Sequence, residues 1–255
     1  MSKHLWLLML LAIILCPLYL FAEDYQTFLA KGDEYWQNFD NVKALGEYEQ
    51  AYKLAPEEFA VLMGLTRSYN NVGEDLDSKA SKPYFEQAVK YAELLLQKFP
   101  DKADTYYYLS ASYGNLALFT GGKTKVKLSR KVKENAEKAI ALDPQHPESH
   151  VVLGIYYREI ANLNPLLKGF AKVFFGGLPG GTNADSEKSL LKALELKPTY
   201  INAHFQLAKT YEEMKQKDKA IAEYQKVLEL PQADHQDKAI QTKAEKRLKR
   251  IKSKN

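Results

Sequence analysis

The sequence of 255 residues contains a single cysteine, and this scarcity excludes several kinds of small stabilised domain. That residue, Cys16, lies within an apolar run at the amino terminus. A chain that lost this run would have no thiol at all. Neither an intrachain disulfide framework nor a cysteine-based zinc site can therefore organise the fold.

The chain also lacks the sequence patterns of a catalytic or nucleotide-binding site. Gly122-Lys123-Thr124 resembles the end of a phosphate-binding loop, but Ala117 stands where that loop has its first glycine, and a helical pattern precedes it. No serine lies in a Gly-x-Ser-x-Gly setting. We therefore predict no catalytic residue, no cofactor and a non-enzymatic function.

Histidine is scarce as well, and the two histidines that suggest a metal pair have structural explanations. His146 and His150 are four residues apart, with Glu148 between them. Pro147 is expected in the first turn of a helix, which leaves His146 outside that helix, while His150 occupies a packing position. We predict structural roles for both histidines and no metal site.

Residues 1–22 differ from the rest of the chain. Residues 5–22 are uncharged and apolar, and Glu23-Asp24 follow them. This layout is typical of a secretory signal that is removed after Ala22, which predicts an exported, periplasmic or secreted protein. A run of this length can also just cross a bilayer, so an uncleaved amino-terminal membrane anchor is the alternative. Only in that case would a membrane be a partner.

Residues 23–255 form a single repeat domain according to their pattern. Five amphipathic helical segments each end at an apolar residue, and a proline follows that residue immediately or one position later. An internal repeat of this kind predicts a stack of similar units whose product is a binding surface. The closing prolines are Pro56, Pro100, Pro144, Pro198 and Pro231.

The last repeat shows the packing pattern most clearly. Leu207, Ala208 and Tyr211 share one face of its first helix, and Ala220 and Tyr224 share one face of its second. Large, small and aromatic residues at these spacings let two antiparallel helices pack closely. The pattern resembles the tetratricopeptide repeat (TPR), which implies an all-α, right-handed superhelical solenoid of about five helix pairs with a carboxy-terminal capping helix. The predicted units are residues 25–56, 59–100, 103–144, 147–198 and 201–231, and the predicted capping helix is 233–251.

The repeats are unevenly spaced, because the closing prolines lie 44, 44, 54 and 33 residues apart. The largest insertion, in the fourth unit, contains a short amphipathic run with Leu166, Phe170, Phe174 and Phe175. We expect this run to pack against the stack, because unpaired aromatic residues usually join a core. Alternatively, residues 163–178 line or cover a pocket for an apolar small molecule or lipid.

The TPR resemblance also implies which side chains would contact a partner. TPR proteins bind ligands on a concave face that is formed by the first helix of each unit. A mixture of aromatic, amide and charged groups suits an extended peptide or a helix. The residues predicted to contact a protein or peptide partner are Trp36, Arg67, Asn71, Tyr107, Asn115, Arg158, Phe205 and Lys209.

The basic charge of the chain is concentrated at its carboxy terminus. Residues 234–255 contain eight basic and three acidic side chains, whereas residues 23–233 contain 27 basic and 29 acidic ones. A solvated capping helix explains this tail, and the body has no basic stripe with interleaved aromatic residues. We therefore expect no nucleic-acid partner.

A closer resemblance covers the chain from about Leu153 to the end. It is carried by the Ala-Asn-Leu turn at 161–163, the Phe175-Gly176 step, and the helix that runs from Asp237-Lys238 into Gln241-Thr242. These features are similar to the regulator of microtubule dynamics family, whose members are TPR adaptors, often membrane-anchored at the amino terminus and linked to microtubules or organelle contacts. The resemblance implies a scaffold for a protein partner. Periplasmic TPR accessory proteins of solute transporters resemble the chain in architecture only.

Overall fold

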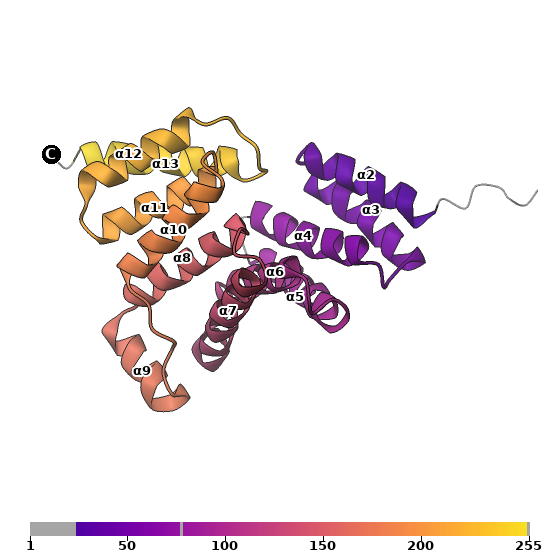
Figure 1. The fold of residues 1–255 in the computed structure, drawn as a ribbon, viewed down its shortest axis with the longest axis horizontal. Coiled ribbons are helices and arrows are strands. Elements are labelled where there is room, and N and C mark those ends of the chain that lie inside the picture. Colours follow the sequence, from indigo (N-terminus) through magenta and orange to yellow (C-terminus); the bar gives the residue numbers. More distant parts are fainter. Residues whose placement is uncertain (1–23, 77–78, 254–255) are drawn as a thin grey trace, which may run out of the picture.

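The computed structural model describes residues 24–76 and 79–253, and every regular element in these ranges is an α-helix (Figure 1). Within the same ranges, no helix combines the length and the apolar character needed to cross a bilayer. The run at 1–22, predicted to be a signal or an anchor, lies outside the described residues. The helices are α2 (Tyr25–Gln37), α3 (Asn41–Leu54), α4 (Phe59–Asp75), α5 (Ser81–Lys98), α6 (Ala103–Ala117), α7 (Gly122–Leu142), α8 (Pro147–Ala161), α9 (Pro165–Phe175), α10 (Asn183–Leu196), α11 (Ile201–Glu213), α12 (Lys217–Glu229) and α13 (Asp237–Lys252).

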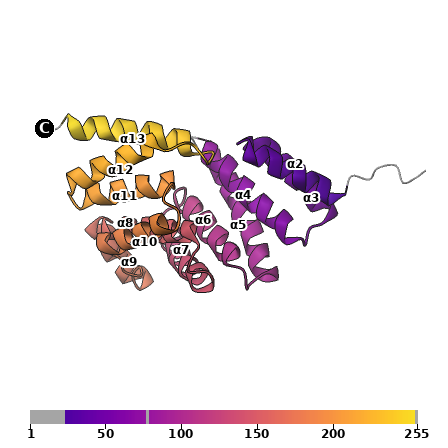
Figure 2. The same ribbon diagram turned by 45° about the horizontal axis from the view of Figure 1, so that its top comes forward.

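The helices pack in successive pairs that stack along a curved path (Figures 1 and 2). The pairs are α2 with α3, α4 with α5, α6 with α7, α8 with α10, and α11 with α12. The first helices of neighbouring pairs also contact one another, so that α2, α4, α6, α8 and α11 form one continuous layer, here called the inner face. This arrangement confirms the predicted all-α repeat solenoid.

The closing prolines explain where the second helix of each pair ends. Pro56, Pro100, Pro144, Pro198 and Pro231 each lie two residues beyond the end of a helix. Proline cannot donate the backbone hydrogen bond that would continue a helix, and it restricts the residue before it to extended conformations. The repeat that is visible in the sequence is therefore a repeat of helix ends.

Large side chains from second helices fill spaces left by glycines on first helices. The side chain of Tyr48 in α3 is fully buried between Gly32 of α2 and Gly64 of α4. A Cβ atom at Gly32 or Gly64 would lie 2.6 or 2.7 Å from the Tyr48 ring. Leu190 of α10 packs in the same way on Gly154 of α8. This size complementarity sets how closely neighbouring helices approach.

The extra residues of the second and third units lengthen their helices. Helices α4, α5 and α7 contain 17, 18 and 21 residues, compared with 13 in each of α11 and α12. In the fourth unit the extra residues instead form the additional helix α9. The side chain of Asn164 accepts a hydrogen bond from the backbone N–H of Leu166 at its start, and Gly176, with a φ of 71°, ends it.

The expectation that the α9 segment packs against the stack is wrong. Leu166, Phe170 and Phe174 are 79, 42 and 65% exposed, and Ala171 is the buried residue of this helix among the side chains described. In the chain, α9 lies between α8 and α10, which already pack against each other. Among the described helices it therefore packs only against α7, apart from a hydrogen bond from Lys168 Nζ to the backbone oxygen of Ala161 at the end of α8, and it protrudes from the stack (Figure 1).

The capping helix begins four residues later than predicted. Residues 233–236 form a turn, and α13 starts at Asp237. The carboxylate of Asp237 accepts hydrogen bonds of 2.8 Å from the backbone N–H groups of both Ala233 and Asp234. The buried Asp237 therefore fixes the turn in place.

Candidate functional site on the inner face

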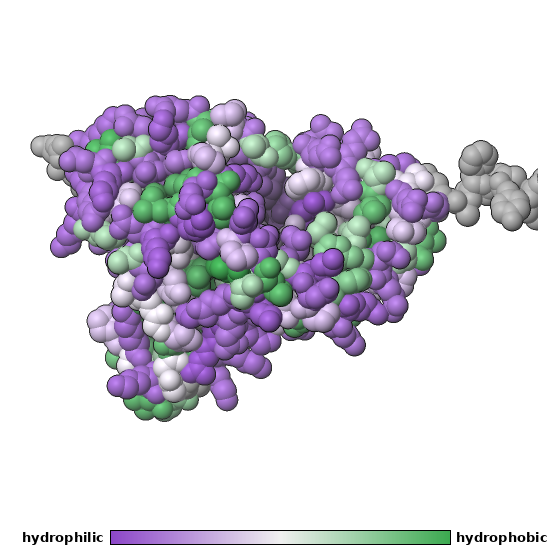
Figure 3. All heavy atoms as spheres, viewed as in Figure 1, coloured by the Kyte–Doolittle hydropathy of each residue, from purple (hydrophilic) through white to green (hydrophobic). Residues whose placement is uncertain are grey.

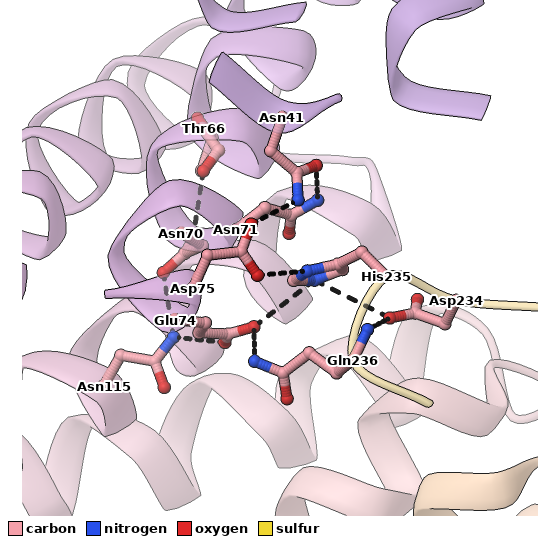
Figure 4. Close-up of polar contacts among 10 residues, drawn as sticks. All are labelled: Asn41, Thr66, Asn70, Asn71, Glu74, Asp75, Asn115, Asp234, His235 and Gln236. Atoms are coloured by element: carbon pink, nitrogen blue, oxygen red, sulfur yellow. Dashed lines mark hydrogen bonds and ion pairs between the residues drawn. The ribbon is translucent and has the colours of Figure 1, made fainter. Parts of the chain in front are cut away.

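The turn before α13 reaches across the inner face and contacts the end of α4. His235 Nδ1 lies 3.0 Å from Asp75 Oδ1, and Gln236 Nε2 donates a hydrogen bond of 2.8 Å to Glu74 Oε2 (Figure 4). The His235 side chain is only 7% exposed. This contact links two parts of the solenoid that are about 160 residues apart in sequence. Figure 3 shows a largely hydrophilic recess between the side formed by α11–α13 and the side formed by α2–α4.

Asparagine side chains extend this contact along the inner face (Figure 4). Asn115 Nδ2 donates to Glu74 Oε1 at 2.7 Å, while Asn41 Nδ2 donates to Asp75 Oδ2 at 2.7 Å. Asn71 Nδ2 in turn donates to Asn41 Oδ1 at 3.0 Å. The amide of the predicted contact residue Asn115 therefore holds Glu74 directly, whereas the amide of Asn71 supports Asp75 only through Asn41.

The ionisation of these groups favours a charged contact. Burial lowers the pKa of His235, but the hydrogen bond to Asp75 and the charges of Asp234 and Glu74 outweigh it, so the pKa lies above its ordinary value. Burial likewise raises the pKa of Asp75, but the hydrogen bonds from His235 and Asn41 outweigh that effect and lower it. The contact is therefore strongest when His235 is protonated.

A second cluster surrounds Arg67 at the amino-terminal part of the inner face. The Arg67 guanidinium lies 3.7 Å from the centre of the Trp36 ring, an arrangement that favours a cation–π interaction. Arg67 Nη2 also donates to Tyr48 Oη at 2.6 Å and to Asp33 Oδ1 at 3.1 Å. The structure thus brings the predicted contact residues Trp36 and Arg67 together, with Trp36 partly exposed.

Tyrosines form the centre of the inner face. The Tyr107 ring lies 4.8 Å from that of Tyr108 and 4.9 Å from that of His146. Burial first, and then nearby groups that include Glu148, raise the pKa values of both Tyr107 and Tyr200 well above their ordinary value. Among the described residues, neither phenolic hydroxyl has a hydrogen-bond partner. Both phenols therefore remain neutral donors on a surface that is only partly buried.

The carboxy-terminal contact residues are largely used within the stack. Phe205 is 6% exposed, with its ring 5.8 Å from that of Tyr224, and the buried Arg158 donates to the backbone oxygen of Gln206 at 3.1 Å. Lys209 is partly exposed, and burial followed by the charge of Arg158 lowers its pKa to about 8. Of these three predicted contact residues, Lys209 alone is accessible to a partner.

The residues predicted to contact an apolar ligand do not enclose a pocket. Leu166, Phe170 and Phe174 are exposed on α9, and the side chain of Phe175 lies outside the described part of the structure. Phe174 borders a cavity of about 310 Å³ whose other lining residues are Lys123, Val126, Lys127 and Arg130. Three of its five lining residues are therefore basic.

Histidine and carboxylate groups of the described ranges do not gather as metal ligands: no cluster of three or more His, Cys, Asp or Glu side chains there could hold an ion. His146 caps α8, because its Nδ1 accepts the backbone N–H of Ser149 at 3.2 Å. His150 Nε2 lies 3.0 Å from the backbone oxygen of Pro144. Both histidines have the structural roles expected from the sequence.

Sequence reasoning missed the residues that join the ends of the inner face. Glu74, Asp75, His235 and Gln236 belong to no motif, and nothing local indicates that residues so far apart in sequence meet. The only available signal was the polar turn before the capping helix, which belongs to the stretch that resembles a known family. Tyr200 was missed because it precedes α11 instead of lying on it.

A comparison with protein families matches this chain over residues 28–252 to the family described as regulator of microtubule dynamics protein 1-3. Regulator of microtubule dynamics protein 3 from Bos taurus is 30% identical over 182 residues, which cover 71% of this chain and 39% of the relative. The corresponding protein from Mus musculus is 29% identical over 86% of this chain and 47% of its own length. The chain thus spans less than half the length of these relatives.

Two further comparisons support the architecture. Regulator of microtubule dynamics protein 1 from Bos taurus is 26% identical over 88% of this chain and 73% of its own length. The crystal structure of a thermophilic TPR protein from Thermus thermophilus superimposes with a TM-score of 0.65 and 22% sequence identity, covering 86% of this chain and 98% of that one. This similarity shows a TPR fold.

These relatives overturn the predicted location and show the family. The prediction of an exported, periplasmic or secreted protein is wrong, because the curated relatives are mammalian proteins named for microtubules, which are polymers of the eukaryotic cytoplasm. The alternative of an amino-terminal anchor concerns residues 1–22, which lie outside the described residues. The apolar character of residues 1–22 was misleading on its own. Because the family match spans nearly the whole described chain, the chain belongs to the regulator of microtubule dynamics protein 1-3 family.

Proposed function

We propose that this chain is a non-enzymatic TPR scaffold that binds a segment of a partner protein along its inner face. One observation carries the proposal: partly exposed aromatic, amide and charged groups from successive units converge on a single surface. Trp36, Tyr107 and Tyr200 contribute rings, and Lys209 contributes an accessible cation. Aromatic rings supply contact area at low entropic cost, while neutral phenols donate hydrogen bonds to a peptide backbone.

The geometry narrows the set of predicted contact residues. Trp36, Arg67, Tyr107 and Lys209 retain an accessible part, whereas Asn71, Arg158 and Phe205 are buried. We therefore assign partner binding to the first group and positioning to the second. Asn115 does both, because it holds Glu74 at the surface where the turn crosses the inner face.

Adjacent tyrosines on α6 supply the test. Tyr107 lies on the inner face, whereas Tyr106 faces α7, where Lys138 Nζ lies 5.9 Å from its ring centre. We expect Tyr107→Ala to weaken partner binding about tenfold or more, because central aromatic residues dominate interface energies. Tyr106→Ala, which removes the same side chain from the same helix, should leave binding unchanged.

Measured affinities and pull-downs would decide the question. The names of the mammalian relatives make polymerised tubulin the first partner to test. Both variants must first show equal thermal unfolding by circular dichroism. Equal binding by the wild type and the Tyr107→Ala variant, or an equal loss in both variants, would contradict binding along the inner face.

The carrier alternative has less support. An enclosed apolar pocket at residues 163–178 requires their apolar side chains to face inward, but those of Leu166 and Phe174 face solvent. We therefore do not propose a carrier function.

A further inference from the structure

Helix α9 presents a continuous apolar stripe to solvent. Leu166, Leu167, Phe170, Val173 and Phe174 follow the spacing of one face of a helix, and they are 79, 52, 42, 75 and 65% exposed. The buried Ala171 lies at the edge of this stripe, next to Leu167 and Phe174, on the side where α9 meets α7. Hydrophobic atoms are visible where α9 protrudes at the bottom of Figure 3.

The segment that carries the stripe and the start of α7 contain basic residues and no acidic ones, although Lys131 and Lys133 are paired with Glu93 and Glu137. Residues 118–133 and 161–182 contain no aspartate or glutamate. Phe174 of α9 borders the same cavity as Lys123, Lys127 and Arg130 of α7, so the basic start of α7 lies directly beside the apolar stripe. In the rest of residues 23–233, 29 acidic residues outnumber 19 basic ones, so these two segments differ in charge from the remainder of the body. The basic residues of the two segments are Lys123, Lys125, Lys127, Arg130, Lys131, Lys133, Lys168 and Lys172.

We propose that α9, together with the basic start of α7, docks onto an acidic phospholipid surface. A short helix with an apolar face and flanking lysines lies in the plane of a membrane, with its apolar side chains below the headgroups. Each nearby lysine or arginine adds attraction to anionic headgroups. This lipid-facing surface is separate from the inner face and does not depend on the partner binding proposed above.

The shape of the surface favours a membrane over a protein partner. Helix α9 protrudes from the rest of the stack as a convex ridge (Figure 1), so its exposed apolar side chains can reach a flat surface. A stable protein interface uses about 20 to 30 residues on each side, many more than one helix of 11 residues supplies. A fluid lipid surface accommodates a convex ridge and requires no complementary shape.

A single fluorescent label can detect the insertion of α9. Cys16 is the only cysteine, so the full chain with Cys16→Ser and Val173→Cys carries one site for an environment-sensitive nitrobenzoxadiazole label. The matched control is Cys16→Ser with Val42→Cys, because Val42 of α3 is 70% exposed and Val173 is 75% exposed. Both chains keep residues 1–22, so any membrane binding by that segment affects both equally.

The label on α9 should respond only to acidic vesicles. With vesicles of phosphatidylcholine and phosphatidylserine in equal parts, we expect the emission at position 173 to rise about twofold or more and to shift to shorter wavelength. Vesicles of phosphatidylcholine alone should give little response at position 173. The label at position 42 should respond to neither. No response at position 173, or an equal response at position 42, would overturn the proposal.

Charge reversal separates insertion from nonspecific attraction. The double substitution Lys123→Glu with Lys127→Glu should raise the lipid concentration needed for half the response at position 173 about tenfold or more. The double substitution Lys243→Glu with Lys246→Glu on α13 should change that concentration little. Equal effects of the two pairs would contradict a docking surface at α9. If position 173 stays silent with vesicles while Lys123 and Lys127 are needed to bind a polyglutamate peptide, the surface is a protein-docking site and the lipid proposal fails.

Discussion

Helix α9 is more apolar than helix α11, yet α11 is buried and α9 is exposed. Helix α11 buries Ile201, Phe205 and Leu207, which are 1, 6 and 0% exposed. Helix α9 leaves its leucines and phenylalanines in solvent wherever their side chains are described. The difference lies in their neighbours among the described helices, because α11 contacts α8, α10, α12 and α13, whereas α9 packs only against α7, apart from a hydrogen bond from Lys168 to the last residue of α8. An apolar stripe joins a core only when helices are available on more than one side.

The largest expected effect tests this contrast with one substitution in each helix. Leu207→Ala should lower the free energy of unfolding by about 2–5 kcal/mol, because it leaves a cavity among fully packed neighbours. Leu166→Ala should change it by about 0.5 kcal/mol or less, because Leu166 is 79% exposed. Urea unfolding followed by circular dichroism measures both values. A large loss for Leu166→Ala would mean that α9 packs against the stack in solution.

Alanine substitutions at two glycines, one in the packed stack and one on α9, test the same contrast and should change stability by an intermediate amount. Gly64→Ala should cost roughly 1–3 kcal/mol, because the new Cβ would lie 2.7 Å from the buried Tyr48 ring. Gly169→Ala on α9 meets no atom within 4 Å and should instead favour the helix by up to about 1 kcal/mol. Denaturant unfolding reports the first change, and slower amide hydrogen exchange within α9 reports the second. Destabilisation by Gly169→Ala would contradict the exposed position of α9.

The smallest expected effect concerns the polar contact between His235 and Asp75, which joins the two ends of the inner face. Among its described residues, helix α9 has no counterpart of this contact. His235→Gln should lower stability by about 1 kcal/mol at mildly acidic pH, because it removes a charged hydrogen bond to Asp75. The pKa of His235 is raised in the folded chain, so its contribution is fully present below the unfolded value of about 6.5 and is lost as pH rises through the folded value.

Unfolding in urea at a series of pH values would measure this dependence. The wild type and the His235→Gln variant should converge in stability above the raised pKa of His235. His150→Gln is the matched control, because His150 lies near a backbone oxygen and not in this network. A stability difference that stays constant or grows with rising pH would show that the charge of His235 does not hold the turn to α4.

The sequence predicted the fold well but the contact surface only in part. The spacing of apolar residues and prolines predicted every helix pair of the solenoid, because helix periodicity and helix ends are local properties. The contact residues were predicted from their positions in the repeat. Such a position predicts the direction of a side chain but not the neighbouring residues that it contacts. Phe205 and Arg158 meet neighbouring helices, whereas Tyr107 and Trp36 keep an accessible side.

The sequence by itself determined the all-α repeat, the ends of its helices and the amphipathic character of α9, since each depends on residues within a few turns of one another. Only the tertiary structure decided that α9 has no core to join and that His235 meets Asp75. The exposure of α9 depends on the direct packing of α8 against α10, whereas the contact between His235 and Asp75 depends on how the curvature of several stacked units adds up along the chain. No local pattern encodes that sum, so distant contacts such as the one between His235 and Asp75 emerge only once the whole stack is in place.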